Sequence, residues 1–193
     1  MSNDNIRHKG RLFVISAPSG GGKSTIIREV LKIRPLIRFS VSATTRRPKN
    51  GEVEGREYHF LSQENFLRMV ESGGLVEYEK VHENYYGTPQ APLEEALAVG
   101  ESVILDLDVK GGFHLKSLYP QTALIFLTPP SLEVLRERIY ARQREKPEEI
   151  EFRLKRIAME IKAAEKFDFI VVNDDLDRTV MQVVSIIDNA LKQ

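Results

Sequence analysis

Cysteine is absent from this sequence of 193 residues. A disulfide-stabilised scaffold, a thiolate metal site and a cysteine nucleophile are therefore excluded. The chain also lacks a net charge, because its 28 Lys and Arg residues balance its 28 Asp and Glu residues. No overall field therefore favours non-specific binding to nucleic acid or to an anionic membrane. The four histidines are scattered without a metal-ligand spacing, and no Ser-His-Asp constellation is apparent.

Long hydrophobic runs are absent as well. The longest, such as those at 12–15 and 123–127, are too short to span a bilayer. Residues 1–10 are polar and contain no apolar segment of the secretory type, so we expect a cytoplasmic protein that begins with a mobile tail. Hydrophobic residues make up 41% of the chain, which is enough for the core of one large domain or of one domain with a small insert.

Short apolar runs of the buried-strand type alternate with helical segments over much of the chain. We expect strands at 11–16, 102–108, 122–127 and 169–172, and helices at 25–32, 112–118, 131–142, 147–165 and 176–191. Ser131 is a good N-cap for the third of these helices. Strands that alternate with helices predict an α/β fold, in which an open parallel sheet is covered by helices on both faces.

The middle of the chain departs from this alternation. Strand-like segments at 39–42, 58–61 and 75–82 surround one short helix at 62–71, which Gly73 and Gly74 end. We therefore expect a small mixed α+β lobe at 38–88, inserted into a core formed by 11–37 and 89–193. A very polar segment at 143–149 separates two predicted helices, so we expect a helical lid at about 138–153.

A glycine-rich loop follows the first predicted strand and leads into the first helix. It consists of Ser19, Gly20, Gly21, Gly22, Lys23, Ser24 and Thr25. Glycines allow successive N–H groups to form a concave anion site, and the helix dipole favours the same anion. Lys23 can reach the β- and γ-phosphates of a nucleoside triphosphate, and the Ser24 hydroxyl is placed for a Mg²⁺ ion.

The loop departs from the phosphate-loop pattern G-x-x-x-x-G-K-[ST], because Ala17 stands at the position of the first glycine. A glycine-rich turn with an incidental lysine is the alternative interpretation. Even as a phosphate loop, the motif indicates only nucleoside triphosphate binding. It does not separate a GTPase, an ATPase motor and a small-molecule kinase.

A second motif lies in the predicted lobe. The pattern T-[ST]-R-x-x-[KR]-x-x-[DE]-x-x-G-x-x-Y-x-[FY] is met at Thr44, Thr45, Arg46, Lys49, Glu52, Gly55, Tyr58 and Phe60. With this motif the chain closely resembles the guanylate kinase family, and the resemblance extends from Leu12 onward through the segments 84–87, 104–108, 129–131 and 172–177. It implies a P-loop kinase that transfers a phosphoryl group from ATP to GMP or dGMP with Mg²⁺. It implies no nucleic-acid or membrane partner.

The resemblance also implies how GMP is held. The phosphate contacts are Arg46, Lys49, Tyr58 and Tyr86, and the guanine contacts are Ser42, Glu77, Thr88 and Asp108. These residue types suit the task, because an arginine fork binds phosphate and a carboxylate accepts from the N–H groups of guanine. Lys49 stands where the family commonly has arginine, and it lacks that fork. Taken alone, the basic turn from Arg46 to Lys49 could be a solvated surface turn, and Glu77 could lie on the solvent-exposed face of a strand.

The predicted strand at 102–108 carries Asp106 and Asp108, whose spacing of two places them on one face. By resemblance, Asp106 assists Mg²⁺ through water and Asp108 faces the acceptor. Lys110 stands where the family often has glutamine.

The resemblance also implies that Arg138, Arg142 and Arg153 close over the triphosphate. Arg138 and Arg142 are four residues apart on a predicted helix, and two arginines at this spacing repel each other unless an anion lies between them. Asn173 matches a position that contacts the adenine of ATP.

Three other classes of protein share parts of this pattern. A guanylate-kinase-like module that binds phosphopeptides without catalysis is disfavoured by the intact Lys23 and Ser24 and by the lid arginines. A kinase for a phosphorylated sugar is disfavoured by the guanine-suited set at Ser42, Glu77 and Thr88. A regulatory GTPase is disfavoured because no N-K-x-D motif is present.

Overall fold

The computed structural model describes residues 10–18, 20–131, 133–134, 140 and 147–192. The predicted tail, apart from Gly10, therefore lies outside the described residues. Within them, no helix has the length and apolarity needed to cross a membrane.

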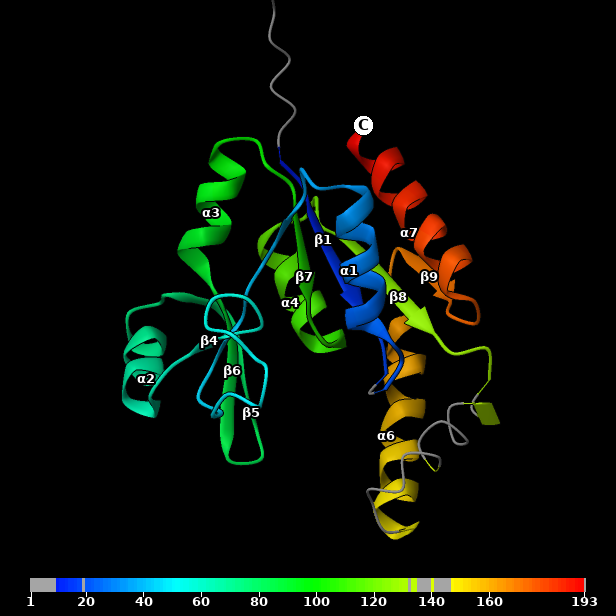
Figure 1. The fold of residues 1–193 in the computed structure, drawn as a ribbon, viewed down its shortest axis with the longest axis horizontal. Coiled ribbons are helices and arrows are strands. Elements are labelled where there is room, and N and C mark those ends of the chain that lie inside the picture. Colours follow the sequence, from blue (N-terminus) through cyan, green and yellow to red (C-terminus); the bar gives the residue numbers. More distant parts are fainter. Residues whose placement is uncertain (1–9, 19, 132, 135–139, 141–146, 193) are drawn as a thin grey trace, which may run out of the picture.

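A five-stranded sheet forms the centre of the molecule (Figure 1). Its strands are β1 (Leu12–Ser16), β2 (Arg38–Phe39), β7 (Val103–Asp106), β8 (Ala123–Thr128) and β9 (Phe169–Val172), in the spatial order β2-β7-β1-β8-β9. Every pair is parallel. All five residues of the central strand β1 are buried, as expected for a parallel strand covered on both faces.

The two faces of this sheet hold separate hydrophobic cores. The helices that cover it are α1 (Lys23–Ile33), α3 (Gln90–Ala98), α4 (Val109–Leu118), α6 (Pro147–Ala164) and α7 (Leu176–Leu191). Successive strand residues point to opposite faces. Phe13 and Ile15 therefore pack with α1 and α7, whereas Leu12 and Val14 pack with α3, α4 and α6. The predicted α/β class, with helices on both faces of a parallel sheet, is confirmed.

A second, mixed sheet lies beside the first (Figure 1). Its strands are β3 (Ala43–Thr44), β4 (His59–Phe60), β5 (Leu75–Val81) and β6 (Asn84–Pro89), in the order β4-β3-β6-β5, and α2 (Gln63–Glu71) packs against it. The fully buried Phe66 of α2 stacks on Tyr85 of β6, with ring centroids 5.5 Å apart. This sheet supplies the predicted mixed lobe.

Two sequence predictions about the start of the lobe are corrected here. The predicted lobe range begins too early, because Arg38–Phe39 pairs with β7 in the large sheet rather than within the lobe. Of the strand expected at 39–42, only Phe39 belongs to a strand, and the lobe sheet begins at Ala43. Sequence reasoning also identified neither β6 nor α3.

The strand predicted at 102–108 ends at Asp106. Asp108 is instead the N-cap of α4, where its Oδ1 accepts a hydrogen bond of 2.7 Å from the Gly111 N–H. Because of this cap, α4 begins at Val109 rather than at Gly112. The two acids are therefore not side by side on one strand, which corrects the argument from their spacing.

The last part of the chain agrees with expectation where it is described. The helices predicted at 147–165 and 176–191 are present as α6 and α7. The helix predicted at 131–142 lies largely outside the described residues. Ser131 Oγ does accept a hydrogen bond of 3.2 Å from the Val134 N–H, as predicted for an N-cap.

Candidate active site

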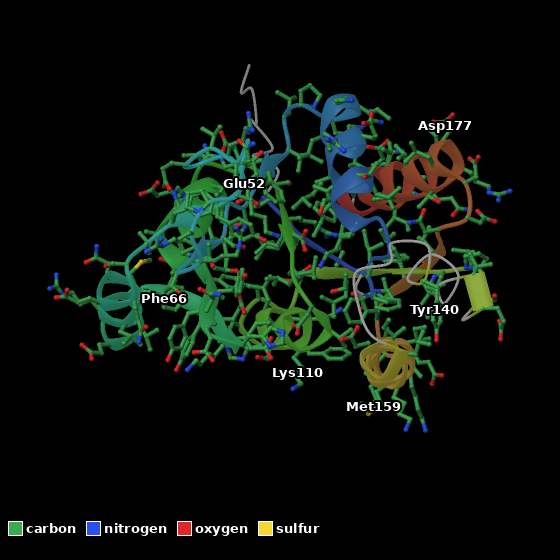
Figure 2. All side chains as sticks on the ribbon, turned by 60° about the horizontal axis from the view of Figure 1, so that its bottom comes forward. Glu52, Phe66, Lys110, Tyr140, Met159 and Asp177 are labelled. Carbon is green, nitrogen blue, oxygen red and sulfur yellow. The ribbon has the colours of Figure 1, made fainter. Side chains whose placement is uncertain are left out.

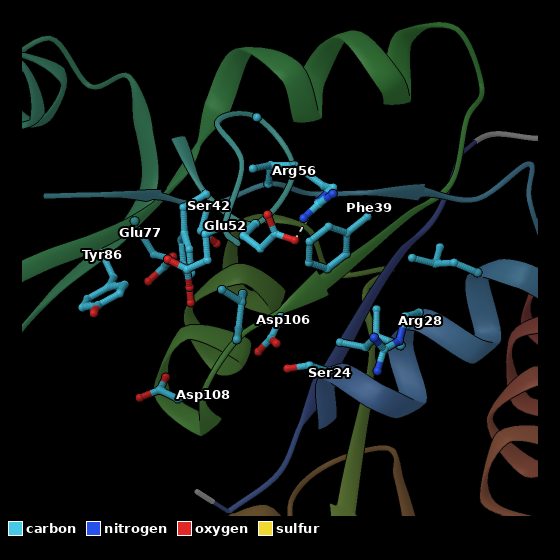
Figure 3. A pocket seen from close by; sticks show the side chains of 18 of the residues that line it. Ser24, Arg28, Phe39, Ser42, Glu52, Arg56, Glu77, Tyr86, Asp106 and Asp108 are labelled. Carbon is cyan, nitrogen blue, oxygen red and sulfur yellow. Dashed lines mark hydrogen bonds and ion pairs between the residues drawn. The ribbon is translucent and has the colours of Figure 1, made fainter. Parts of the chain in front are cut away.

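A cleft of about 1150 Å³ opens at the carboxyl ends of β1 and β7. The chain leaves these two neighbouring strands in opposite directions, since β1 leads through α1 to β2 and β7 leads through α4 to β8. Such a switch point is where open α/β sheets bind ligands. The lobe sheet forms the facing wall of the cleft through β5 and β6 (Figure 3).

The glycine loop contains Ser24, which lines this cleft. Gly20 and Gly22 have φ angles of +86° and +81°, which side chains rarely allow. Gly22 is the N-cap of α1, without a side-chain hydrogen bond, and the first turn of α1 holds no acid. The first N–H groups of α1 are therefore left for an external acceptor, and the helix dipole favours an anion there.

Lys23 is held at the junction of the glycine loop and β7. Its ammonium group forms an ion pair with Asp106 and donates to the Leu107 carbonyl at 3.2 Å. Ser16 Oγ donates to the same carbonyl. The side chains of Lys23 and Asp106 remain 20% and 28% exposed, and Asp106 lines the cleft.

A half-buried carboxylate marks the lobe end of the cleft. Glu77 of β5 pairs in register with Thr88 of β6, and Thr88 Oγ1 donates to Glu77 Oε1 at 2.6 Å. Burial raises the pKa of Glu77, and the nearby carboxylates of Asp108 and Glu79 raise it further. A half-buried carboxylate of this kind suits a ligand that offers N–H donors.

Arg46 is fixed by a partner that sequence reasoning did not assign. Its two terminal nitrogens donate to the two oxygens of Glu52, both at 2.9 Å. Glu52 also accepts from the Lys49 backbone N–H at 2.6 Å, and the guanidinium lies 5.4 Å from the Tyr58 ring centroid. Hydrogen bonding raises the pKa of Arg46 and lowers that of Glu52. The presence of both residues in the family motif was the available signal for this pair.

The cleft brings together seven of the predicted site residues, whereas Lys23, Arg46 and Asn173 are described but do not line it. Those that line it are Ser24, Ser42, Tyr58, Glu77, Tyr86, Asp106 and Asp108. Thr88 is buried beside Glu77, whereas the side chain of Lys49 is exposed. Further lining residues that the sequence did not indicate include Phe39, Arg28, Arg56 and Glu79.

Several predicted residues fall outside the described part. Ser19, Arg138 and Arg142 are among them, as is the side chain of Arg153, whose backbone belongs to α6. Asn173 is described, and its side-chain amide donates to the Gly21 carbonyl at 2.6 Å. Lys110 is exposed on α4 and points away from the body of the protein (Figure 2).

Two oxygen ligands for a cation lie in the cleft. Ser24 of α1 and Asp106 at the end of β7 both line it (Figure 3). Among the described residues, no group of three or more His, Cys, Asp or Glu side chains could hold a metal ion. This donor set fits Mg²⁺, which is commonly held by one or two protein oxygens together with substrate phosphates.

The parallel sheet, with a glycine loop leading into a helix that begins with Lys23 and Ser24, defines a nucleotide-binding protein of the phosphate-loop class. The guanylate kinase family profile matches residues 9–190. A guanylate kinase from Chlorobium luteolum is 48% identical over 189 residues, covering 97% of this chain and 96% of that relative. One from Chlorobaculum tepidum is 45% identical and covers all of both chains.

The same relationship is found in three dimensions. The crystal structure of guanylate kinase from Anaplasma phagocytophilum matches with a TM-score of 0.79 at 33% identity, covering 96% of this chain and 88% of that chain. The chain belongs to the guanylate kinase family. It is therefore a nucleoside monophosphate kinase, a class of phosphotransferase.

Proposed function

We propose that this protein transfers the γ-phosphoryl group of ATP to GMP or dGMP, giving ADP and the guanine diphosphate. The observation that carries this proposal is the single cleft lined both by Ser24 and Asp106 beside the glycine loop and by Glu77 on the lobe. A triphosphate in the loop and a monophosphate on the lobe can face each other across this cleft.

The proposed chemistry needs alignment and charge neutralisation more than covalent catalysis. The attacking atom is a phosphate oxygen of GMP, so no general base is required. We assign alignment of that phosphate to Arg46, Lys49, Tyr58 and Tyr86. Lys23, together with Arg138, Arg142 and Arg153 of the predicted lid, would stabilise the charge on the migrating group.

Mg²⁺ is proposed as the metal of this reaction, held by Ser24 Oγ and, through water, by Asp106. When bound, the ion would neutralise charge on the triphosphate oxygens. Adenine of ATP is assigned to the neighbourhood of Asn173.

Selection of guanine over adenine follows from hydrogen-bond chemistry. Guanine presents the N1–H and N2 amino donors, which the Glu77 carboxylate can accept, and the O6 acceptor, to which the Ser42 hydroxyl can donate. Thr88 orients Glu77 through its 2.6 Å hydrogen bond, and Asp108 adds a second carboxylate at the base. Adenine would leave the half-buried Glu77 carboxylate without donors from the base, at a cost of about 1–3 kcal/mol or more.

The direct test is ADP release from ATP and Mg²⁺ with GMP, dGMP, AMP and UMP as acceptors. Turnover with GMP and dGMP and none with AMP or UMP is expected. Turnover with none of the four would favour either the non-catalytic binding module or a kinase for a phosphorylated sugar. ATP or GTP hydrolysis without an acceptor would favour an NTPase.

The affinity for GMP is expected to fall as the pH is lowered from about 7 to about 5. The ionised form of Glu77 accepts from guanine, and burial raises its pKa, so the carboxylate becomes protonated at a higher pH than an exposed glutamate. Calorimetric titration with GMP across this range measures the effect.

The phosphate of GMP also titrates near pH 6, and Glu77→Gln separates the two effects. This variant keeps the phosphate titration and loses that of the carboxylate. Identical pH dependence of GMP affinity in the wild type and the variant would contradict the assignment to Glu77.

Replacing Lys49 by arginine is expected to lower KM for GMP by about three- to tenfold. A guanidinium can bind phosphate through two parallel hydrogen bonds, whereas an ammonium acts as a point charge. Steady-state kinetics at saturating ATP give the number. Lys80→Arg is the control, because Lys80 lies outside the lobe motif and its ammonium lies over the Tyr85 ring, 5.5 Å from the centroid. An unchanged KM for Lys49→Arg would remove Lys49 from the phosphate contacts.

A further inference from the structure

Asn173 directly follows β9. Its backbone amide and its side-chain amide each donate a hydrogen bond, to two different segments of the chain. Its backbone N–H donates to the Thr128 carbonyl at 2.7 Å, which fixes the residue to the end of β8. Its side-chain Nδ2 donates to the Gly21 carbonyl at 2.6 Å. The side chain therefore ties the glycine loop to the ends of two strands of the central sheet.

The contact is a close one. A Cβ atom added to Gly22, whose φ is +81°, would lie 3.1 Å from Asn173 Nδ2. That distance is tighter than ordinary van der Waals contact, so Asn173 packs directly against the backbone of Gly22. The absence of a side chain at Gly22 permits this approach.

Holding the Gly21 carbonyl also sets the direction of the next N–H group. The Gly21 carbonyl and the Gly22 N–H belong to one peptide unit, and none of the described peptide bonds is cis. In a trans unit the C=O and N–H bonds point to opposite sides. With its carbonyl turned to Asn173, this unit must direct the Gly22 N–H away from Asn173. The Gly21 N–H itself is already used, because it donates to the Pro18 carbonyl at 2.8 Å.

We propose that Asn173 is a positioning residue for the phosphate loop: by holding the Gly21 carbonyl, it aims the Gly22 N–H at the polyphosphate of the donor nucleotide. The identity of that polyphosphate as ATP rests on the proposed function. This role goes beyond contact with adenine. A contact with adenine affects only nucleotides that carry this base, whereas loop positioning affects every polyphosphate that enters the loop.

Inorganic tripolyphosphate separates the two roles, because it has phosphates and no base. The affinities of the full chain for tripolyphosphate, for ATP and for GMP are measured by calorimetry in the wild type and in Asn173→Ala. The variant loses the one hydrogen bond that orients the Gly22 N–H toward the phosphates. Its affinities for tripolyphosphate and for ATP are therefore expected to fall by a similar factor, about five- to tenfold. The affinity for GMP and the melting temperature should stay close to those of the wild type.

Two further variants sharpen the test. Asn173→Asp keeps the shape of the side chain but removes its donor and adds a negative charge near the phosphates, so its loss of affinity should exceed that of Asn173→Ala. Asp174→Ala is the matched control, because the carboxylate of the neighbouring exposed residue pairs with Arg178 at 2.5 Å instead of contacting the loop. This control is expected to change neither affinity by more than about twofold.

The proposal is overturned if Asn173→Ala lowers the affinity for ATP while the affinity for tripolyphosphate is unchanged, since Asn173 would then act on the base. It is also overturned if both affinities are unchanged, or if Asp174→Ala has the same effect. Wild-type protein that binds tripolyphosphate but forms no GDP from ATP and GMP would refute the proposed function and leave the positioning role standing.

Discussion

Lys23→Ala is expected to lower kcat by at least about 10²–10³-fold, while KM for GMP stays within about twofold. The ammonium lies where the glycine loop meets β7, so it can neutralise charge on the triphosphate as the phosphoryl group moves. Apart from Asp108, the assigned GMP contacts belong to the lobe, as Ser42, Glu77 and Tyr86 show (Figure 3), and they do not include this lysine. Steady-state kinetics with each substrate varied in turn separate the two parameters.

Lys192→Ala serves as the control for this experiment. Lys192 is an exposed lysine just after α7, and the carboxyl end of α7 lies near the carboxyl end of α1 rather than near its beginning (Figure 1). Its removal should leave kcat unchanged. Near-normal turnover of Lys23→Ala would show that the glycine loop does not bind the reacting phosphates, and the proposed mechanism would fail with it.

The second large effect is expected at the lobe end of the cleft. Glu77→Gln should lower kcat/KM for GMP by about 10²-fold and change KM for ATP by no more than about twofold. The amide can still accept the hydrogen bond from Thr88, but it lacks the charge and presents an NH₂ group that cannot accept from the guanine donors. Initial rates with GMP varied at saturating ATP, and the reverse, measure both numbers.

Glu79→Gln is the matched control, because Glu79 lies two residues further along the same face of β5 and also lines the cleft. Glu79 is exposed, so loss of its charge should change kcat/KM for GMP by less than about threefold. Equal losses in the two variants would mean that the general negative charge of this wall matters, rather than a specific contact between Glu77 and the base.

Helices, strands and loops that are determined by residues close in the sequence could be predicted from the sequence. The strand, glycine loop and helix around Lys23 were anticipated because a buried run, permissive glycines and an amphipathic segment follow one another directly. The closing helix, at Leu176–Leu191, was placed correctly. Its N-cap is Asp175, which accepts from the Arg178 N–H at 2.9 Å.

Elements whose formation depends on residues far away in the sequence were harder to predict. The strand β6 is a strand because it pairs with both β3 and β5, and no pattern within Asn84–Pro89 required this. Arg38–Phe39 joins the large sheet because β7, more than sixty residues later, offers its edge. Asp108 was assigned to a strand by its alternation with Asp106, yet the cap on Gly111 ends that strand and starts α4.

The sequence by itself determined the class of this protein, because the glycine loop and the lobe motif each lie within a short stretch whose residue types define their chemistry. Tertiary structure alone decided that Ser24 and Glu77 share one cleft. It also decided that Asn173 reaches the glycine loop across 152 positions. These relations arise from how the strands are ordered in the sheets, and packing between residues far apart in the chain sets that order.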